Sequence, residues 1–515
     1  MNARLEAVRN IGKRTRRVSE SDQIKDSSSW KGEALDLKLP LLRSEENLNS
    51  AMIKLLNLCG VSADSVYSTL GIEQEYFLID RSLFLLRPDL LLGGRTVFGT
   101  QPPKELEDRY FGNVNDRVMA YMEEFENAAI RLGILVKTRH NKLAPAQYEV
   151  SPFFEKASIA VDHNLQLIEL MRQIALKHDL ACLFHEKPFM GIDGSNKQNN
   201  WSLSTDTGLN LLDPKGDSLV FLILLTAILS GISEHAPLLE ASIASAGNDH
   251  RLKDSELLYL GQALEQLVET IVHGKKEDLH LKTIVLSDLD GADRNHSSFF
   301  AFTGNQFAFR AVGASANPAL PALVIHAIVT DSLLLILEKI GSIIKDRTLT
   351  EEALFQAVLP VLRKSLREAL PTFGVYKMRK SVHAFKEFID KKSIRIFEGI
   401  LTEEELYTRY EIILEQYVKT MNCEANLMIE LFQTQILPAV QMKTSLIENG
   451  IQAVEEIKKM QSQISDFGTE AKAKVFCELI EPKMEELRGF VDQLEMVVDD
   501  TLWPLPKYRE LLYFI

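Results

Sequence analysis

The spacing of apolar residues changes its period along this chain, and that change limits the folds open to it. Up to about residue 318, apolar and alternating segments are separated by polar turns rich in Gly, Asn, Ser and Thr. Beyond residue 318, Gly becomes sparse and apolar residues recur at helical spacing. We therefore predict an α+β protein with a sheet-containing domain at residues 31–318 and a helical region at residues 319–515.

Several segments of the first part have a readable pattern. Helical spacing predicts helices at residues 45–60, 116–132 and 162–178. Strands are expected at residues 69–79 and, as two short strands around a loop, at residues 135–150. Residues 219–230 form an apolar run that fits a buried helix or a strand. Residues 299–312 alternate about Gly304-Asn305, which predicts a hairpin.

The C-terminal region has two apolar stripes at helical spacing, at residues 451–464 and 476–498. Asp466-Phe467-Gly468 lies between them, and Gly often ends a helix. We predict an antiparallel helical hairpin whose first helix ends at Gly468. The apolar stripes indicate that these helices pack against other apolar surfaces, and contacts within an oligomer could be part of that packing.

Charge and cysteine content narrow the functional classes. The chain has 58 Lys and Arg residues and 72 Asp and Glu residues. This excess of acidic residues argues against a nucleic-acid-binding surface. The four cysteines fit no zinc pattern, and we expect a reduced, cytoplasmic protein. The apolar runs are too short or too interrupted to span a membrane. Residues 1–30 are basic without an apolar stretch, which predicts a disordered leader, with a targeting or partner-binding arm as the alternative.

Acidic residues on the predicted strands are candidates for chemistry. Glu73 and Glu75 are two positions apart, so on a strand both carboxylates lie on one face. Their mutual repulsion is relieved if a divalent cation such as Mg²⁺ binds between them. Glu149 adds a third carboxylate on a nearby predicted strand. The alternative is an exposed polar strand face.

Polar segments farther along favour anion binding. Residues 191–203 form a Gly-containing turn whose backbone amides suit a carboxylate or phosphate, although an ordinary loop has the same composition. Arg251, Arg294 and Arg310 lie in later polar segments. Forked guanidinium groups suit phosphate or carboxylate, although a lone Arg is more often a surface group.

These motifs occur in an order that matches one family. The matching blocks include Glu73-Gln-Glu-Tyr-Phe-Leu-Ile-Asp80, Lys137-Thr-Arg-His-Asn141, His185-Glu-Lys-Pro-Phe189, Asn199-Asn-Trp-Ser-Leu203, Ala244-Ser-Ala-Gly-Asn-Asp-His-Arg-Leu252, Phe309-Arg-Ala-Val-Gly313 and Leu502-Trp-Pro-Leu-Pro506. From about Lys31 to its last residue, the chain resembles the type III glutamine synthetases. The resemblance implies a catalytic domain built on an antiparallel sheet or partial barrel with surrounding helices, and ATP-dependent joining of ammonia to glutamate with Mg²⁺ or Mn²⁺.

The resemblance also implies roles for individual residues. Three carboxylates match metal ligands: Glu73, Glu75 and Glu149. The catalytic and substrate positions are Arg251, Arg294, Arg310 and Glu256. Ser202 and Asn200 lie on the nucleotide side.

Four positions depart from the family pattern. Lys142 replaces a Glu, Gln198 a metal-binding His, Ala308 a Glu and His296 an Arg. Two lesser departures, Asp193 for Asn and Gln306 for Lys, affect the substrate and nucleotide sides. Three metal ligands are thus missing, and an ammonium group stands where the family has a carboxylate. We expect Lys142 to pair with Glu75 or Glu149 in the cation's place.

These departures predict an impaired or inactive member of the family that acts by binding or assembly. Only about 30 residues precede the first matching block, so we expect the family's N-terminal β-grasp domain to be absent. Since the family forms rings, a homo-oligomer or a hetero-oligomer with a complete paralogue is expected. Two alternatives stay open: an active ligase that uses glutamate and ammonia, and a purely structural paralogue with no ligand.

Overall fold

The computed structural model describes most of the chain. The described residues are 34, 36–102, 112–274, 279, 281, 298–344, 349–440 and 444–513. The predicted leader at residues 1–30 lies outside them, as do Arg294 and His296.

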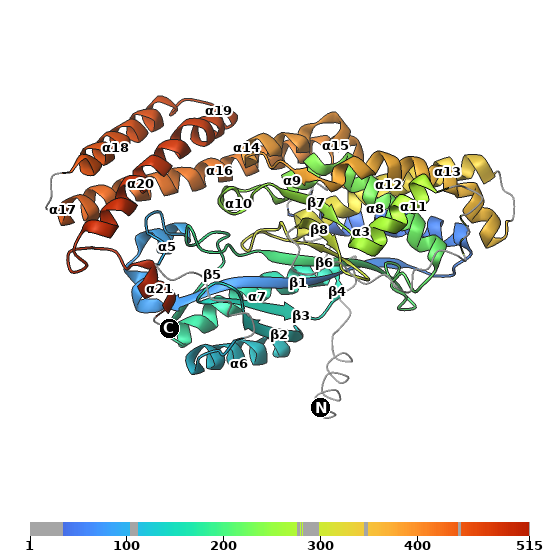
Figure 1. Cartoon of the computed structure of the whole chain (residues 1–515), viewed down its shortest axis with the longest axis horizontal. Helices are drawn as coiled ribbons and strands as arrows, with labels where there is room; N and C mark the ends of the chain where they lie inside the picture. Colours follow the sequence, from blue (N-terminus) through green and yellow to red (C-terminus); the bar gives the residue numbers. More distant parts are fainter. Residues whose placement is uncertain are drawn as a thin grey trace.

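A sheet of ten strands forms the centre of the described part (Figure 1). Its order is β10-β7-β8-β9-β6-β1-β3-β2, and β4 and β5 pair with β1. The strands are β1 (Val66–Asp80), β2 (Val136–Asn141), β3 (Gln147–Pro152), β4 (Glu155–Lys156), β5 (Leu180–Leu183), β6 (Lys197–Thr205), β7 (Ser255–Tyr259), β8 (Ser298–Phe302), β9 (Phe307–Phe309) and β10 (Val375–Tyr376). All pairs are antiparallel except β7 with β8, which are parallel. The α+β class, the strand at residues 69–79 and the hairpin about Gly304 are confirmed.

Apolar helices pack with the sheet into the largest core. They include α3 (Lys38–Cys59), α8 (Ser218–Glu234), α12 (Ala319–Ile344) and α13 (Glu351–Ala369). The ambiguous run at residues 219–230 is therefore a helix, buried along almost its whole length. By length and composition α12 alone among single described helices could cross a membrane, but 72% of its most apolar stretch is buried in the protein, as in a core helix.

A second group of helices covers the other end of the sheet. The helices α6 (Asp116–Arg131) and α7 (Ala157–Lys177) pack against β1 and β3 around Tyr76, and both predicted helices are thereby confirmed. The side chain of Asn115 accepts a hydrogen bond from Val118 N and so begins α6 as an N-cap.

Shorter helices connect these layers. They are α4 (Arg81–Leu85), α5 (Pro88–Gly93), α9 (Ala236–Ile243), α10 (Ala246–Arg251), α11 (Gln262–His273), α14 (Ser381–Ala384) and α15 (Lys391–Ile396). Before α5, the buried Arg87 forms a two-bond ion pair with Asp89 and donates to Pro506 O and Phe98 O. This arginine joins the sheet domain to the C-terminal segment.

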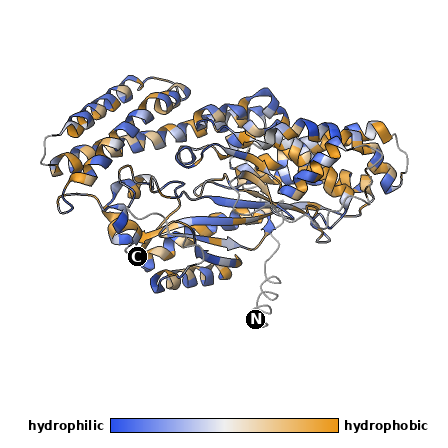
Figure 2. Cartoon of the chain, viewed as in Figure 1, coloured by the Kyte–Doolittle hydropathy of each residue, from blue (hydrophilic) through white to orange (hydrophobic). Residues whose placement is uncertain are grey.

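Four C-terminal helices share a second core: α16 (Glu403–Leu431), α18 (Ser445–Gln463), α19 (Thr469–Val475) and α20 (Glu481–Val497). The short α17 (Leu437–Ala439) lies between α16 and α18, and α21 (Tyr508–Tyr513) packs instead in a cluster that includes residues of β1 and β5. The two predicted stripes lie on α18 and on the α19–α20 segment, where Phe476–Ile480 forms a π-helical turn. Hydrophobic and hydrophilic residues alternate along these helices (Figure 2).

The predicted end of the first hairpin helix is wrong. α18 ends at Gln463, and Phe467 N donates to Ile464 O. Gly468 has φ −66° and ψ 159°, an extended conformation, and it is the N-cap of α19. A glycine between two helices can end the first helix or begin the second. Here the preceding residues already turn the chain, so Gly468 begins the second helix.

Candidate active site

Strand register brings the predicted metal positions onto one face of the sheet. Glu75 lies directly opposite Glu149, and Glu73 lies directly opposite Gln198. Side chains alternate along a strand, and directly opposed residues share a face. Asn200, two residues after Gln198, and Ala308 opposite it therefore lie on the same face. Glu73, Glu75 and Glu149 and two of the replaced positions, Gln198 and Ala308, form one continuous surface, called here the carboxylate face.

Lys142 connects two of these carboxylates. Its Nζ lies 2.9 Å from Glu75 Oε1 and 2.9 Å from Glu149 Oε2. Its backbone N donates to Gln147 O at 2.8 Å, which holds the turn between β2 and β3. The predicted pairing is confirmed, with both partners instead of one. Glu75 Oε2 also accepts a hydrogen bond of 2.8 Å from Asn196 N, so both of its oxygens have donors.

The charges on the carboxylate face stabilise one another. Burial would lower the pKa of Lys142, but Glu75 and Glu149 outweigh it and raise that pKa well above its usual range. Burial and the neighbouring Glu149 raise the pKa of Glu73 to about 7. Near neutral pH Lys142 therefore keeps its charge, and Glu73 is partly protonated.

This arrangement does not fit a divalent cation between Glu75 and Glu149. The two oxygens that would ligate it already contact an ammonium group at 2.9 Å. Mg²⁺ needs oxygen ligands at about 2.0–2.1 Å in near-octahedral geometry. Gln198 and Ala308 add no anionic ligand. In the described part of the chain, no group of three or more His, Cys, Asp or Glu is placed to hold a metal ion.

Arg251 lies beside Arg310, but its guanidinium is bound to the protein itself. It donates to Asn248 Oδ1 at 2.9 Å and to Ala311 O at 2.6 Å, with Arg310 O at 3.5 Å. Burial lowers the pKa of Arg251 to about 10, against the opposing charges of nearby carboxylates. Arg310 is half-buried, and its backbone N donates to Phe299 O. The two predicted arginines are thus brought together at the end of β9.

A buried carboxylate behind Arg251 was given no role from the sequence. Glu186 is 2% exposed, and its Oε1 accepts hydrogen bonds from Ser315 N at 3.0 Å and Ser315 Oγ at 2.6 Å. A Cβ atom at Gly247 or Gly313 would lie 2.1 or 2.3 Å from its carboxylate oxygens, so any other residue at either position would displace the Glu186 carboxylate. The available signal was a charged residue inside the His185–Phe189 motif together with glycines in two later motifs.

The nucleotide-side residues also make bonds within the protein. Ser202 Oγ lies 2.7 Å from Asn210 Oδ1 and 3.1 Å from Asn305 O. Asn200 Nδ2 donates to Gly71 O, and its Oδ1 accepts from Gln198 Nε2 at 3.0 Å. To hold a nucleotide, Ser202 and Asn200 would have to exchange these partners. The fit to ATP is therefore incomplete in this arrangement.

Glu256 lies on the strand β7. This strand is paired on one side with β8 and on the other with β10. In the sheet order, β8, β9 and β6 separate β7 from β1. Strand pairing on both sides fixes the backbone of Glu256.

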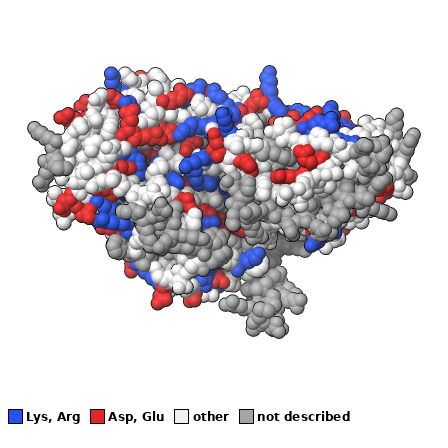
Figure 3. All heavy atoms as spheres, viewed as in Figure 1, with Lys and Arg blue, Asp and Glu red and all other residues white. Residues whose placement is uncertain are grey.

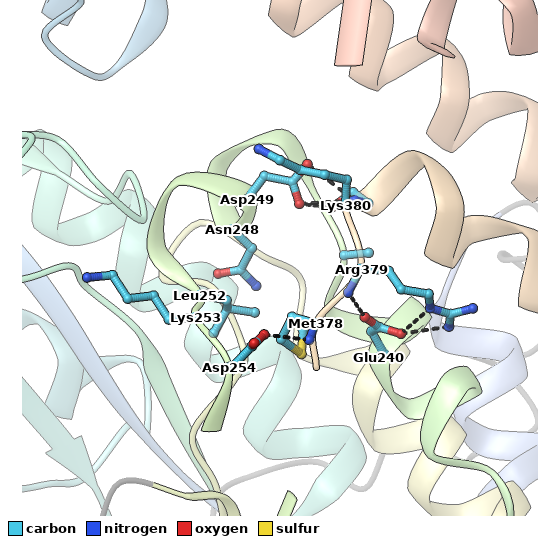
Figure 4. A pocket seen from close by; sticks show the side chains of 11 residues that line it. Glu240, Asn248, Asp249, Leu252, Lys253, Asp254, Met378, Arg379 and Lys380 are labelled. Atoms are coloured by element: carbon cyan, nitrogen blue, oxygen red, sulfur yellow. Dashed lines mark hydrogen bonds and ion pairs between the residues drawn. The ribbon is translucent and has the colours of Figure 1, made fainter. Parts of the chain in front are cut away.

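Carboxylates of α9, of α10 and of the loop after α10 bind residues 378–381, where α14 begins (Figure 4). Asp254 accepts from Met378 N at 3.0 Å, and Glu240 accepts from Arg379 Nε at 2.6 Å. Asp249 accepts from Ser381 Oγ at 2.6 Å. A cavity of about 140 Å³ lies between these elements and residues 378–381. Burial raises the pKa of Asp249 to about 7, against hydrogen bonds from Ser381.

Comparisons with known proteins identify the families that this chain matches. The glutamine synthetase catalytic-domain family matches residues 57–255, and the glutamine synthetase C-terminal-domain family matches residues 370–455. A solved structure titled "GmaS/ADP complex-Conformation 1" overlaps 73% of this chain and 78% of that chain with a TM-score of 0.41 and 19% identity. No functional conclusion follows from an overlap of that score.

Two curated proteins are similar over nearly the whole chain. The type-3 glutamine synthetase of Dictyostelium discoideum is 38% identical over 94% of this chain and 75% of its own length. The glutamine synthetase of Bacteroides fragilis is 37% identical over 94% of this chain and 76% of its own length. Identity of this extent, together with the two matched domains, leads to one conclusion. The chain belongs to the type III glutamine synthetase family.

Proposed function

We propose that this protein is a glutamine synthetase-family member with little or no ligase activity, which acts by binding or assembly. The observation that carries the proposal is the position of Lys142, whose ammonium group bridges Glu75 and Glu149. The family reaction transfers a phosphoryl group to glutamate before ammonia displaces it, and such transfers depend on divalent cations and arginines that balance the phosphoryl charge.

The residues of this chain supply few of the charges that would neutralise a phosphoryl group. The ammonium group holds the carboxylates that would attract a cation, and Gln198 and Ala308 are neutral. Arg251 donates to a side-chain amide and to backbone carbonyls, so its guanidinium is already engaged. Loss of one electrostatic element from an active site typically costs about 10²–10³ in rate. Several such losses in one site support activity far below that of an intact ligase, although they need not multiply.

Binding or assembly is the function that this fold can still perform. The proposed organisation has a catalytic-type domain at residues 31–318 and a helical region at residues 319–515, in the cytoplasm. The proposed partners are further copies of this chain or a complete paralogue in a hetero-oligomer. On the face in Figure 3, acidic and basic side chains are interspersed, which suits protein contacts better than nucleic acid.

One observation favours an active ligase as the second candidate. Glu73, Glu75, Glu149, Arg251 and Arg310 all keep the family identity. The Lys142 side chain is 22% exposed, so its ammonium group has a route to solvent if a metal ion displaces it. Under this candidate, glutamate, ammonia, ATP and Mg²⁺ or Mn²⁺ are the substrates and cofactors.

Phosphate release from ATP separates the two candidates. The purified protein is incubated with glutamate, ammonia and Mg²⁺ or Mn²⁺, and the Bacteroides fragilis relative is assayed alongside it as the positive control. We expect no glutamate-dependent rate above background while circular dichroism shows a folded protein. A rate of about 1 per second or more, which is ordinary for enzymes, would refute the proposal and establish the ligase.

A further inference from the structure

Three charged or titratable side chains meet where α10, the helix that bears Arg251, lies beside the C-terminal helices (Figure 1). His250 comes from α10, Arg95 from the segment after α5, and Glu424 from α16. Arg95 Nη1 donates to Glu424 Oε2 at 2.7 Å and is also hydrogen-bonded to His250 Nε2. The side chains of Arg95, Glu424 and His250 are 6%, 1% and 9% exposed, so the cluster is almost entirely buried. None of the three belongs to the carboxylate face.

The bond between Arg95 and His250 fixes the protonation state of the histidine. A guanidinium group stays charged and has only N–H donors. The ring nitrogen that faces it, His250 Nε2, must therefore accept, and the ring is neutral with its proton on Nδ1. A second proton would turn Nε2 into a donor that faces another donor. His250 Nε2 also lies 3.5 Å from Glu424 Oε2, the oxygen that Arg95 already binds, so the two cations would compete for one acceptor.

A second histidine beside this cluster is held in the same way. The backbone N of Lys187 donates to His185 Nδ1 at 2.9 Å, so this ring nitrogen is an acceptor as well. His185 packs against the segment that carries Arg95, because a Cβ atom at Gly94 would lie 3.6 Å from its ring. Protonation of either histidine therefore breaks a hydrogen bond that orients its ring.

The surroundings of the two rings disfavour their protonation. Burial lowers the pKa of both, that of His185 to about 4. The charged groups that face them are Arg95, Glu186, Lys380 and Glu424, with Glu481, Glu485 and Arg488 on the adjoining helix and Asp249 and Arg251 on α10 itself. The nearby carboxylates favour protonation, but burial and Arg95 outweigh them. The unfolded chain therefore takes up these protons at a higher pH than the folded protein, and the junction loses stability as the pH falls below about 6.5.

We propose that Arg95, His250 and Glu424 form an acid-sensitive latch between the sheet domain and α16. At neutral pH the latch is closed. In mild acid His250 becomes a cation beside Arg95, and α10 separates from α16 while the apolar core of the C-terminal helices stays packed. Because α10 also carries Arg251, opening the latch loosens the helix that holds this arginine of the candidate site. The inference does not depend on whether the protein is a ligase.

Hydrogen–deuterium exchange with mass spectrometry tests the proposal at pH 7 and pH 5, with each rate corrected for the pH dependence of intrinsic exchange. Peptides from α10 and from the part of α16 around Glu424 should exchange about tenfold faster or more at pH 5, since one proton shifts an opening equilibrium by up to about tenfold per pH unit. Peptides from α18 should change little. His250→Gln offers an oxygen that accepts from Arg95 and has no proton to gain, so it should abolish the acid-induced increase.

His273→Gln is the matched control, because it makes the same change on α11, where the His273 side chain is 63% exposed. This variant should respond to pH as the unmodified protein does. An acid-induced increase of equal size in His250→Gln would overturn the proposal. Should His250→Gln fail to fold, the unmodified protein still decides. No increase at pH 5 in α10 and α16, or a uniform increase that includes α18 and so shows global unfolding, would overturn the latch.

Discussion

Replacing Lys142 by Met removes the bridging ammonium group and keeps a side chain of similar length. Glu75 and Glu149 then face each other from directly opposed positions on β1 and β3, with side chains 6% and 4% exposed. Like charges directly opposite one another on a sheet are destabilising. The variant therefore isolates the contribution of this one cation to the sheet.

The expected loss follows from the burial of the three groups. Removing one partner of a buried ion pair typically costs about 3–5 kcal/mol of unfolding free energy. Because the Lys142 side chain is 22% exposed, water partly screens the bridge and the low end, about 3 kcal/mol, applies. Burial already raises the pKa of Glu75, and Lys142 opposes that rise. Without Lys142 this pKa rises further, so the loss should be larger at pH 8 than at pH 5.5, where the carboxyl group takes up a proton.

Urea unfolding at both pH values, with and without Mn²⁺, measures these effects. Mn²⁺ should restore stability to Lys142→Met, because three carboxylates without an ammonium group attract a cation, and it should leave the unmodified protein nearly unchanged. Lys156→Met is the control, since Lys156 is an exposed lysine on β4, which also pairs with β1. A loss no larger than that of the control, or equal stabilisation of both proteins by Mn²⁺, would refute the reasoning.

Three further substitutions test other parts of the structure. Gly247→Ala places a Cβ atom 2.1 Å from Glu186 Oε2 and should cost about 2 kcal/mol or more in urea unfolding, whereas Gly341→Ala in α12 meets nothing within 4 Å and should not destabilise. Arg87→Leu leaves Asp89 buried without its partner and should lower the unfolding free energy by about 3–5 kcal/mol. Asp249→Asn should gain stability relative to the unmodified protein as the pH rises from about 4 to 7. The raised pKa of Asp249 means that the folded state keeps its proton over that range while the unfolded state loses it, so the unmodified protein loses stability as the pH rises. A difference in melting temperature that stays constant across a pH series would contradict this.

The local features of the fold were readable from the sequence because they depend on neighbouring residues. The strand containing Glu73 and Glu75 and the hairpin about Gly304 follow from alternation and a turn residue. The bridge from Lys142 was predictable because a cationic side chain replaces a carboxylate beside two that remain. An ammonium group beside two carboxylates has few other partners.

Other features depend on contacts between distant segments, which periodicity does not encode. The parallel pairing of β7 with β8 and the three strands that separate Glu256 on β7 from β1 are set by strand order. The predicted ligand-binding residue Arg251 donates to Ala311 O, 60 positions along the chain, and that contact was not readable from the sequence. Glu186 is explained only when Gly247 and Gly313 are seen to enclose it. Each of these facts requires the assembled core.

The most direct test of the central claim is a Mn²⁺ titration of the unmodified protein, followed by electron paramagnetic resonance of the bound ion. If the ammonium group of Lys142 takes the cation's place, no ion binds tightly at the carboxylate face, and Glu75→Gln leaves the titration unchanged. Stoichiometric Mn²⁺ binding that is lost in Glu75→Gln would show that the metal displaces Lys142, and would contradict the account.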